Sequence, residues 1–138
     1  MDKKDLFTGK RIVAIVDDEK DITVLFKDML QRIKGISIVT FNDPKIALEH
    51  ENNNAAYALV LCDFKMPELN GMELIKKIKE LNHFVRTILI TAFAINRDLF
   101  QEYAKKKIID NFLQKPIHLD DLIEEVNIQL HKFELQKK

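Results

Sequence analysis

The sequence of 138 residues lacks the features that mark several large classes of protein. It has one cysteine, Cys62, so no disulfide can form within the chain, which fits a reducing cytosol. Lys plus Arg and Asp plus Glu number 22 each, so the strong basic excess of a nucleic-acid-binding surface is missing. No apolar run approaches the roughly 20 residues of a membrane-spanning helix, and residues 1–10 have no apolar signal-peptide core. We therefore expect a cytoplasmic protein that binds neither nucleic acid nor membrane.

Reactive side chains follow four short apolar runs. The runs are Ile12–Val16, Ala58–Cys62, Ile88–Ile90 and Phe112–Leu113, and they lead to Asp17 and Asp18, Asp63, Thr91 and Lys115. Runs of this length that are rich in Val, Ile and Leu and lack clean alternation are typical of strands buried on both faces. Helix-like stretches separate the runs, so we expect parallel strands with the reactive residues at the carboxyl edge of one sheet. In open α/β sheets, ligands bind at that edge.

Hydrophobic periodicity predicts five strands and five helices in strict alternation. The expected strands are Arg11–Val16, Ile36–Phe41, Tyr57–Cys62, Thr87–Ile90 and Asn111–Gln114, the second being an edge strand because it alternates. The expected helices are Asp21–Ile33, one from Pro44 to about Glu49, one opened by Asn70 and Glu73 through Leu81, Asn96–Lys107, and one from Leu119 through Phe133 into the tail. Right-handed crossovers place helices on both faces of the sheet. The sequence therefore predicts one doubly wound α/β domain over residues 11–135, with a flexible arm (1–10) and a short tail (136–138).

The acidic residues at the strand ends favour a metal site. Carboxylates as crowded as those of Asp17, Asp18 and Asp63 cannot all stay ionised unless a cation joins them. Cys62 directly precedes Asp63 but should face the opposite side of its strand, and no His is close in sequence. The nearby ligands are therefore oxygens, which selects a hard ion such as Mg²⁺ that retains several waters. The Asp17–Asp18 pair on its own fits a solvated strand end with a helix cap equally well.

Asp63 is the candidate nucleophile, because a carboxylate can attack phosphorus to form an acyl phosphate. Such a transfer needs in-line positioning and neutralised charge on the equatorial oxygens. Mg²⁺, the Lys115 ammonium and the Thr91 hydroxyl could each hold one of these oxygens. Thr91 alone fits an ordinary strand end and Lys115 alone a solvated loop lysine, so their common edge is what favours phosphoryl chemistry.

Residues 63–71, Asp-Phe-Lys-Met-Pro-Glu-Leu-Asn-Gly, resemble the phosphorylation-site signature of response-regulator receiver domains from two-component signalling. Asp17–Asp18, Thr91–Ala92 and Lys115–Pro116 extend the resemblance over about residues 11–133. The family implies a flavodoxin-like fold with strand order 2-1-3-4-5. It also implies phosphoryl transfer from a phosphohistidine on a sensor histidine kinase or a histidine phosphotransfer protein.

The resemblance also implies roles for individual residues. Asp63 resembles the phosphoacceptor, Asp18 a direct Mg²⁺ ligand and Asp17 a second acid that acts through metal-bound water. The backbone carbonyl of Lys65 would be a further ligand.

A second group of residues resembles the family's conformational switch. Thr91 and Lys115 correspond to the phosphate-sensing pair, and Lys115–Pro116 to a cis peptide bond. Phe112 corresponds to an aromatic residue that turns inward when Thr91 moves toward the phosphate. The last two helices and the fifth strand would then present a changed face to a downstream protein. Lys107–Ile108 replaces the family's usual Ala-Gly, so we expect the approach to the fifth strand to differ.

Three hypotheses follow for the function. The first is a stand-alone receiver of the chemotaxis or sporulation single-domain type, which catalyses only its own phosphorylation and dephosphorylation. The alternative is a receiver-like interaction module that works without phosphate, although a scaffold gains nothing from such crowded charge. The third is a phosphohydrolase with an aspartyl nucleophile, which commonly needs an acid two residues later, where this chain has Lys65. A homodimer through the same output face is left open.

Overall fold

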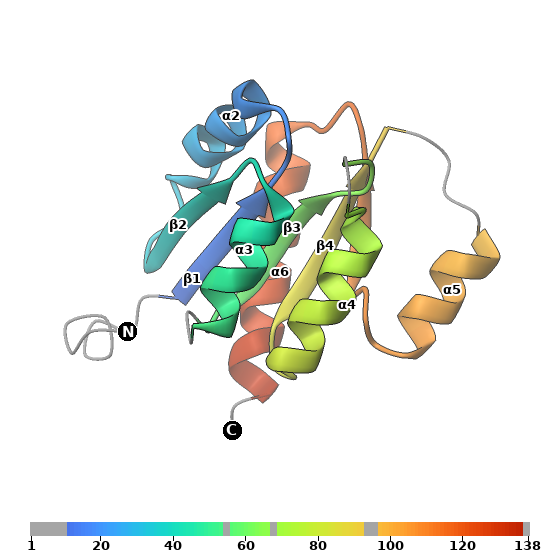
Figure 1. Ribbon diagram of the computed structural model, residues 1–138. Coiled ribbons are helices and arrows are strands. Elements are labelled where there is room, and N and C mark those ends of the chain that lie inside the picture. The colour runs from blue at the N-terminus through green and yellow to red at the C-terminus, as the bar shows by residue number, and fades with distance from the viewer. Residues whose placement is uncertain (1–10, 54–55, 67–68, 93–96, 137–138) are drawn as a thin grey trace.

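The computed structural model describes residues 11–53, 56–66, 69–92 and 97–136. Strands and helices alternate along the chain (Figure 1). The elements are β1 (Arg11–Val16), α2 (Lys20–Leu30), β2 (Ile36–Phe41), α3 (Pro44–Asn52), β3 (Leu59–Asp63), α4 (Gly71–Leu81), β4 (Arg86–Thr91), α5 (Arg97–Lys105), β5 (Asn111–Gln114) and α6 (Leu119–Gln136). The expected arm (1–10), the expected helix start at Asn96 and residues 137–138 of the tail lie outside the described residues.

The five strands form one parallel sheet in the order β2-β1-β3-β4-β5. This confirms the predicted doubly wound, flavodoxin-like arrangement and the position of β2 at an edge. Helices α2 and α6 cover one face of the sheet, and α3, α4 and α5 cover the other (Figure 1). None of the described helices is long and apolar enough to cross a bilayer.

Successive residues of the central strands enter different cores. Val13 and Ile15 of β1 pack toward α2 and α6, whereas Ala14 and Val16 pack toward α3 and α4. Because both faces are covered, every position from Val13 to Val16 is buried. This explains why the apolar runs show no alternation.

Three helix ends differ from the prediction, one being that of α5, which ends at Lys105 rather than Lys107. Helix α2 ends at Leu30 rather than Ile33, and the chain then turns through Gly35, whose φ of 81° suits glycine. Helix α3 continues to Asn52 rather than about Glu49. Glu51 lies beyond the expected end of this helix, but it is buried in the helix and accepts a hydrogen bond from the backbone N–H of Tyr57 (3.1 Å).

Candidate functional site

Three carboxylates converge at the carboxyl edge of the sheet, as the strand ends predict. Asp17 follows β1 and Asp63 ends β3, and these strands are neighbours in the sheet. With Asp18, each offers one carboxylate oxygen, and these oxygens all lie within 4.8 Å of one another. Asp17 and Asp63 are buried, whereas Asp18 is exposed. The cluster therefore combines a shielded interior side with an open side.

Hydrogen bonds hold Asp17 in place, but only one of its two carboxylate oxygens accepts one from the described residues. Its Oδ1 accepts a hydrogen bond from the backbone N–H of Glu19 (2.9 Å), and its backbone carbonyl accepts one from the Asn42 side chain (2.9 Å). Its Oδ2 is buried and receives no hydrogen bond from the described part of the chain. Lys115 Nζ is 3.7 Å from this oxygen, close enough for an ion pair but too long for a good hydrogen bond.

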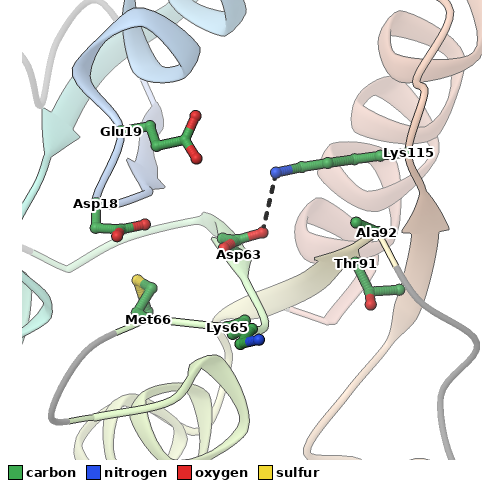
Figure 2. A pocket seen from close by; sticks show the side chains of 8 residues that line it. All are labelled: Asp18, Glu19, Asp63, Lys65, Met66, Thr91, Ala92 and Lys115. Carbon is green, nitrogen blue, oxygen red and sulfur yellow. Dashed lines mark ion pairs between the residues drawn. The ribbon is translucent and has the colours of Figure 1, made fainter.

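Lys115 reaches into the cluster from the end of β5 and lies 3.2 Å from Asp63 Oδ1 (Figure 2). Its backbone N–H donates to the Thr91 carbonyl (2.7 Å), which ties the ends of β4 and β5 together. The Lys115–Pro116 peptide bond is cis, as the resemblance implies. Burial alone would lower the pKa of Lys115, but its hydrogen bond to Asp63 and the charges of Asp63 and Asp17 outweigh burial and raise it.

One ammonium does not neutralise the acids. Burial raises the pKa of Asp17 from 3.8 to about 6, and the charges of Asp63 and Asp18 add to the rise. Burial also raises the pKa of Asp63 despite its contact with Lys115. The ionised cluster is thus short of positive charge.

These carboxylates fit a hard divalent cation. The donors are all oxygens, and Asp17 Oδ2 is a buried acceptor without a hydrogen bond among the described residues. Mg²⁺ binds through one or two carboxylates and retains waters, which the open side of the cluster allows. The residues present therefore match the predicted metal.

A pocket opens beside the cluster. Its lining residues are Asp18, Glu19, Asp63, Lys65, Met66, Thr91, Ala92 and Lys115 (Figure 2). The predicted site residues Asp18, Asp63, Lys65, Thr91 and Lys115 thus share one pocket, next to Asp17. Glu19, Met66 and Ala92 also line the pocket but were not predicted as site residues, although the adjacency of Glu19 to Asp17–Asp18 was a usable signal.

Phe112 lies outside this pocket. It is 38% exposed on β5, and its ring packs edge-on against Phe100 of α5, with 4.5 Å between ring centroids. Its role as a switch residue stays a prediction.

Gly71 places α4 against the end of β3. A Cβ atom at Gly71 would lie 2.2 Å from the backbone oxygen of Asp63, which no real contact permits. The Gly71 N–H donates to the Phe64 carbonyl (2.9 Å), which joins the start of α4 to the residue after Asp63. Asn70 then caps α4 by accepting the backbone N–H of Glu73 (2.9 Å), as predicted.

Known proteins share this sequence and fold. The protein-family model described as the response regulator receiver domain matches residues 13–127. The chain is 30% identical over 120 residues to the transcriptional regulatory protein CpxR homolog of Haemophilus influenzae, covering 87% of this chain but 50% of that protein. It is 27% identical over 120 residues to chemotaxis protein CheY1 of Helicobacter pylori, covering 86% of this chain and 95% of that one.

The fold has a close structural counterpart. The CheY-like response regulator receiver domain protein from Methanospirillum hungatei superposes with a TM-score of 0.81 at 24% identity, covering 92% of this chain and 98% of the other. The chain thus spans half the length of the Haemophilus protein and nearly all of the Helicobacter protein. With the match over residues 13–127, this chain belongs to the response regulator receiver domain family of two-component systems.

Proposed function

We propose that this protein is a phosphorylation-activated signalling switch. Asp63 accepts a phosphoryl group from the phosphohistidine of a sensor histidine kinase or a histidine phosphotransfer protein. The observation that supports this most strongly is the convergence of Asp63 with two further carboxylates and Lys115 beside one pocket. The phosphoryl group stays on the protein itself after the transfer. The protein is therefore a phosphoacceptor rather than an enzyme that turns over a separate substrate.

The transfer uses the residues as they lie. A carboxylate oxygen of Asp63 attacks phosphorus, the P–O bond forms as the P–N bond to the donor imidazole breaks, and the imidazole leaves. Lys115, already 3.2 Å from Asp63, stays beside the new phosphoryl oxygens. Asp17, Asp18, Asp63 and the backbone carbonyl of Lys65 would hold Mg²⁺. When bound, the ion neutralises charge on the attacking and phosphoryl oxygens.

The conformational response begins at Thr91. This residue ends β4 and lines the pocket, so its hydroxyl can move toward the phosphoryl group. The space that it leaves lets Phe112 turn inward from its contact with Phe100. The face built by α5, β5 and α6 then changes. Couplings of about 1–3 kcal/mol are typical of such two-state shifts and suffice for a partial switch.

The remaining assignments belong to the same proposal. Residues 11–135 form the receiver, with residues 1–10 as an arm and 136–138 as a tail. The protein acts in the cytoplasm and signals by protein–protein contact. A phosphohydrolase is disfavoured because Lys65, two residues after Asp63, is a cation where such an enzyme needs an acid.

Intact-mass spectrometry tests the proposal. The protein is incubated with Mg²⁺ and acetyl phosphate, beside a sample with chelator and the Asp63→Asn variant. We expect the mass of one phosphoryl group on the wild type with Mg²⁺ and on neither control. If no adduct appears with acetyl phosphate or with a panel of histidine kinases, the proposal fails and a phosphate-independent interaction module becomes the better explanation.

A further inference from the structure

The outer edge of β2 lies on the far side of β1 from the phosphoacceptor strand β3 (Figure 1). The Phe41 carbonyl accepts a hydrogen bond from the N–H of Asp17, just after β1 (3.1 Å). Backbone groups of alternate residues in a strand point to the same side, so those of Ile36, Ile38 and Thr40 point away from β1. They form no hydrogen bond with the described part of the chain. The edge therefore offers N–H donors and C=O acceptors to an added strand.

This edge has none of the usual devices that prevent strand pairing. Proteins block exposed edges with short strands, lysines or prolines. Strand β2 reads Ile-Ser-Ile-Val-Thr-Phe, with no proline and no charged residue in six positions, whereas β5 at the other edge has four residues. Of the two edges, β2 is therefore the one suited to pairing.

A groove runs beside this edge, between β2 and the last turns of α2. Its lining residues are Lys27, Gln31, Ile33, Ile36 and Ile38. The three isoleucines are partly buried and pack on the core between the sheet and the α2 side. An added strand would place every second side chain over this apolar floor.

The groove is positively charged. Of its lining residues Lys27 alone is charged, and it is exposed and forms no ion pair with a described residue. Lys20 is seven positions earlier and so lies on the same side of α2. The acids Asp21 and Asp28 directly follow these lysines, so they lie about 100° further around the helix, away from its buried side. A carboxylate on a partner would thus meet an available ammonium.

These features together select the occupant. A nucleic acid would use the Lys27 charge but leave the strand edge and the isoleucines without a partner. A second copy is disfavoured, because antiparallel pairing of two β2 strands places both α2 helices on one face of the joined sheet. Lys27 of each copy would then face the other, and like charges across an interface are unfavourable.

We propose that the edge of β2 binds an extended acidic segment of a partner protein as an additional strand. The segment pairs with the backbone of Ile36, Ile38 and Thr40, lays alternate apolar side chains over the groove, and places a carboxylate beside Lys27. The inference does not rest on phosphorylation of Asp63, and the groove shares no lining residue with the pocket around it.

The charge is tested with a synthetic peptide of alternating valines and threonines flanked by glutamates, and a second peptide with lysines in place of the glutamates. Binding is followed by fluorescence anisotropy without phosphodonor. We expect Lys27→Glu to bind the glutamate peptide about tenfold more weakly than the wild type, and the lysine peptide more tightly. The control Lys76→Glu reverses an exposed charge on α4 and should bind within about twofold of the wild type.

The strand geometry is tested on the peptide backbone. In an added strand, alternate N–H groups point toward β2 and the others toward solvent. N-methylation of one alternate set should therefore abolish binding, and N-methylation of the other set should leave it unchanged. Thr40→Pro removes an outward N–H from β2 at an exposed position and should weaken binding about tenfold.

Several outcomes overturn the proposal. They are no binding of the glutamate peptide, equal loss in Lys27→Glu and Lys76→Glu, and equal loss from both N-methylated peptides. A wild-type dimer in light scattering that Thr40→Pro makes monomeric does so too, because a second copy would then be the occupant. So does tighter peptide binding by Phe7→Ser, because residues 1–10 of the chain itself would then occupy the edge.

Discussion

Asp17 shows at the scale of a single residue how the site is tuned for a cation. Burial raises its pKa to about 6, so its charged form is costly in the folded protein without metal. Its Oδ2 receives no hydrogen bond from the described residues, and the Lys115 ammonium is 3.7 Å away. A bound cation would remove this cost.

Asp17→Asn should stabilise the protein in the presence of chelator. The folded protein binds this proton more tightly than the unfolded chain does, because the pKa rises from 3.8 to about 6. The stability contributed by protonated Asp17 is therefore full below pH 3.8 and is lost as the pH rises to about 6. At pH 7 the variant should be more stable by up to about 3 kcal/mol, and equal to the wild type near pH 3.

Urea denaturation across this pH range, with chelator, measures the difference. Addition of Mg²⁺ should stabilise the wild type more than the variant, since the variant lacks one of the carboxylates that would hold the ion. A variant that is less stable than the wild type at pH 7 in chelator would contradict the proposed cost of the Asp17 charge.

Position in the sequence was enough to find most of the site. Asp17, Asp18, Asp63, Thr91 and Lys115 each lie at or just after a strand end, and a parallel sheet brings strand ends together. The orientation of Phe112 was not predictable in the same way, because it depends on a contact with Phe100 from another helix. The burial of Glu51 was missed for the same reason.

At the scale of elements, the start of α4 closely approaches the end of β3. Only glycine fits at position 71, because the backbone oxygen of Asp63 occupies the space of a Cβ atom. This contact joins the helix start to the phosphoacceptor strand.

Gly71→Ala should therefore lower both stability and phosphorylation rate. We expect a loss of about 1–3 kcal/mol from overpacking, and slower adduct formation because the Asp63 backbone must shift. Gly35→Ala is the matched control: among the described residues its Cβ would meet the Arg11 side chain, at 3.7 Å, although its φ of 81° makes alanine strained. It should lose stability but keep the wild-type phosphorylation rate, and equal slowing in both variants would refute a local effect at Asp63.

The end of α5 also departs from the expected pattern. Lys107 adopts a φ of 60°, and the backbone N–H of Ile108 donates to the Tyr103 carbonyl (2.9 Å), so a lysine occupies a helix-terminating position that glycine favours. The approach to β5 was expected to differ at Lys107–Ile108, and the left-handed backbone of Lys107 is the difference that the structure has there.

Lys107→Gly should raise stability by up to about 1 kcal/mol, because a non-glycine residue pays roughly 1–2 kcal/mol for this conformation and glycine does not. Lys106→Gly, one residue earlier, should instead lower stability, since it adds backbone freedom and removes the pair with Glu102 (3.0 Å). Thermal denaturation of both variants gives the comparison. If both changes stabilise the protein, or neither does, the left-handed backbone of Lys107 is not a source of strain.

Element boundaries were predictable where polar residues mark both ends. Strands β1, β2 and β5 have the predicted limits, whereas β4 gains Arg86 and Thr91, which pair with Leu59 and Gln114. Strand β3 begins at Leu59 rather than Tyr57, because the Tyr57 N–H is taken by Glu51. Pairing with neighbouring strands and hydrogen bonds from side chains set these limits, so the hydrophobic periodicity of the segment itself cannot predict them.

At the scale of the whole molecule, the carboxyl ends of the strands carry the candidate site, and buried charges hold the opposite, amino ends of β4 and β5. At the amino ends of β4 and β5, Asp110 pairs with Lys79 of α4 (3.0 Å) and Arg86 of β4 (3.2 Å). It also accepts the backbone N–H of Thr87 (2.8 Å). This network joins three elements at the end of the sheet away from Asp63.

Asp110→Asn should destabilise the fold by about 3–5 kcal/mol, because it leaves two largely buried cations without their counter-charge. Glu102→Gln breaks an exposed pair and should cost below about 1 kcal/mol. Urea denaturation at neutral pH distinguishes the two. The folded fraction of Asp110→Asn should still accept phosphate, and a loss below about 1 kcal/mol would show that the network is dispensable.

The measurement that tests the phosphoryl switch most directly is the position of the modification. After treatment with acetyl phosphate and Mg²⁺, borohydride reduces an aspartyl phosphate to homoserine, and peptide mass spectrometry locates the changed residue. We expect homoserine at position 63 and at no other aspartate, with none in the chelated sample. Modification at Asp17 or Asp18 instead, or a phosphoryl group that borohydride does not reduce, would contradict Asp63 as the acceptor.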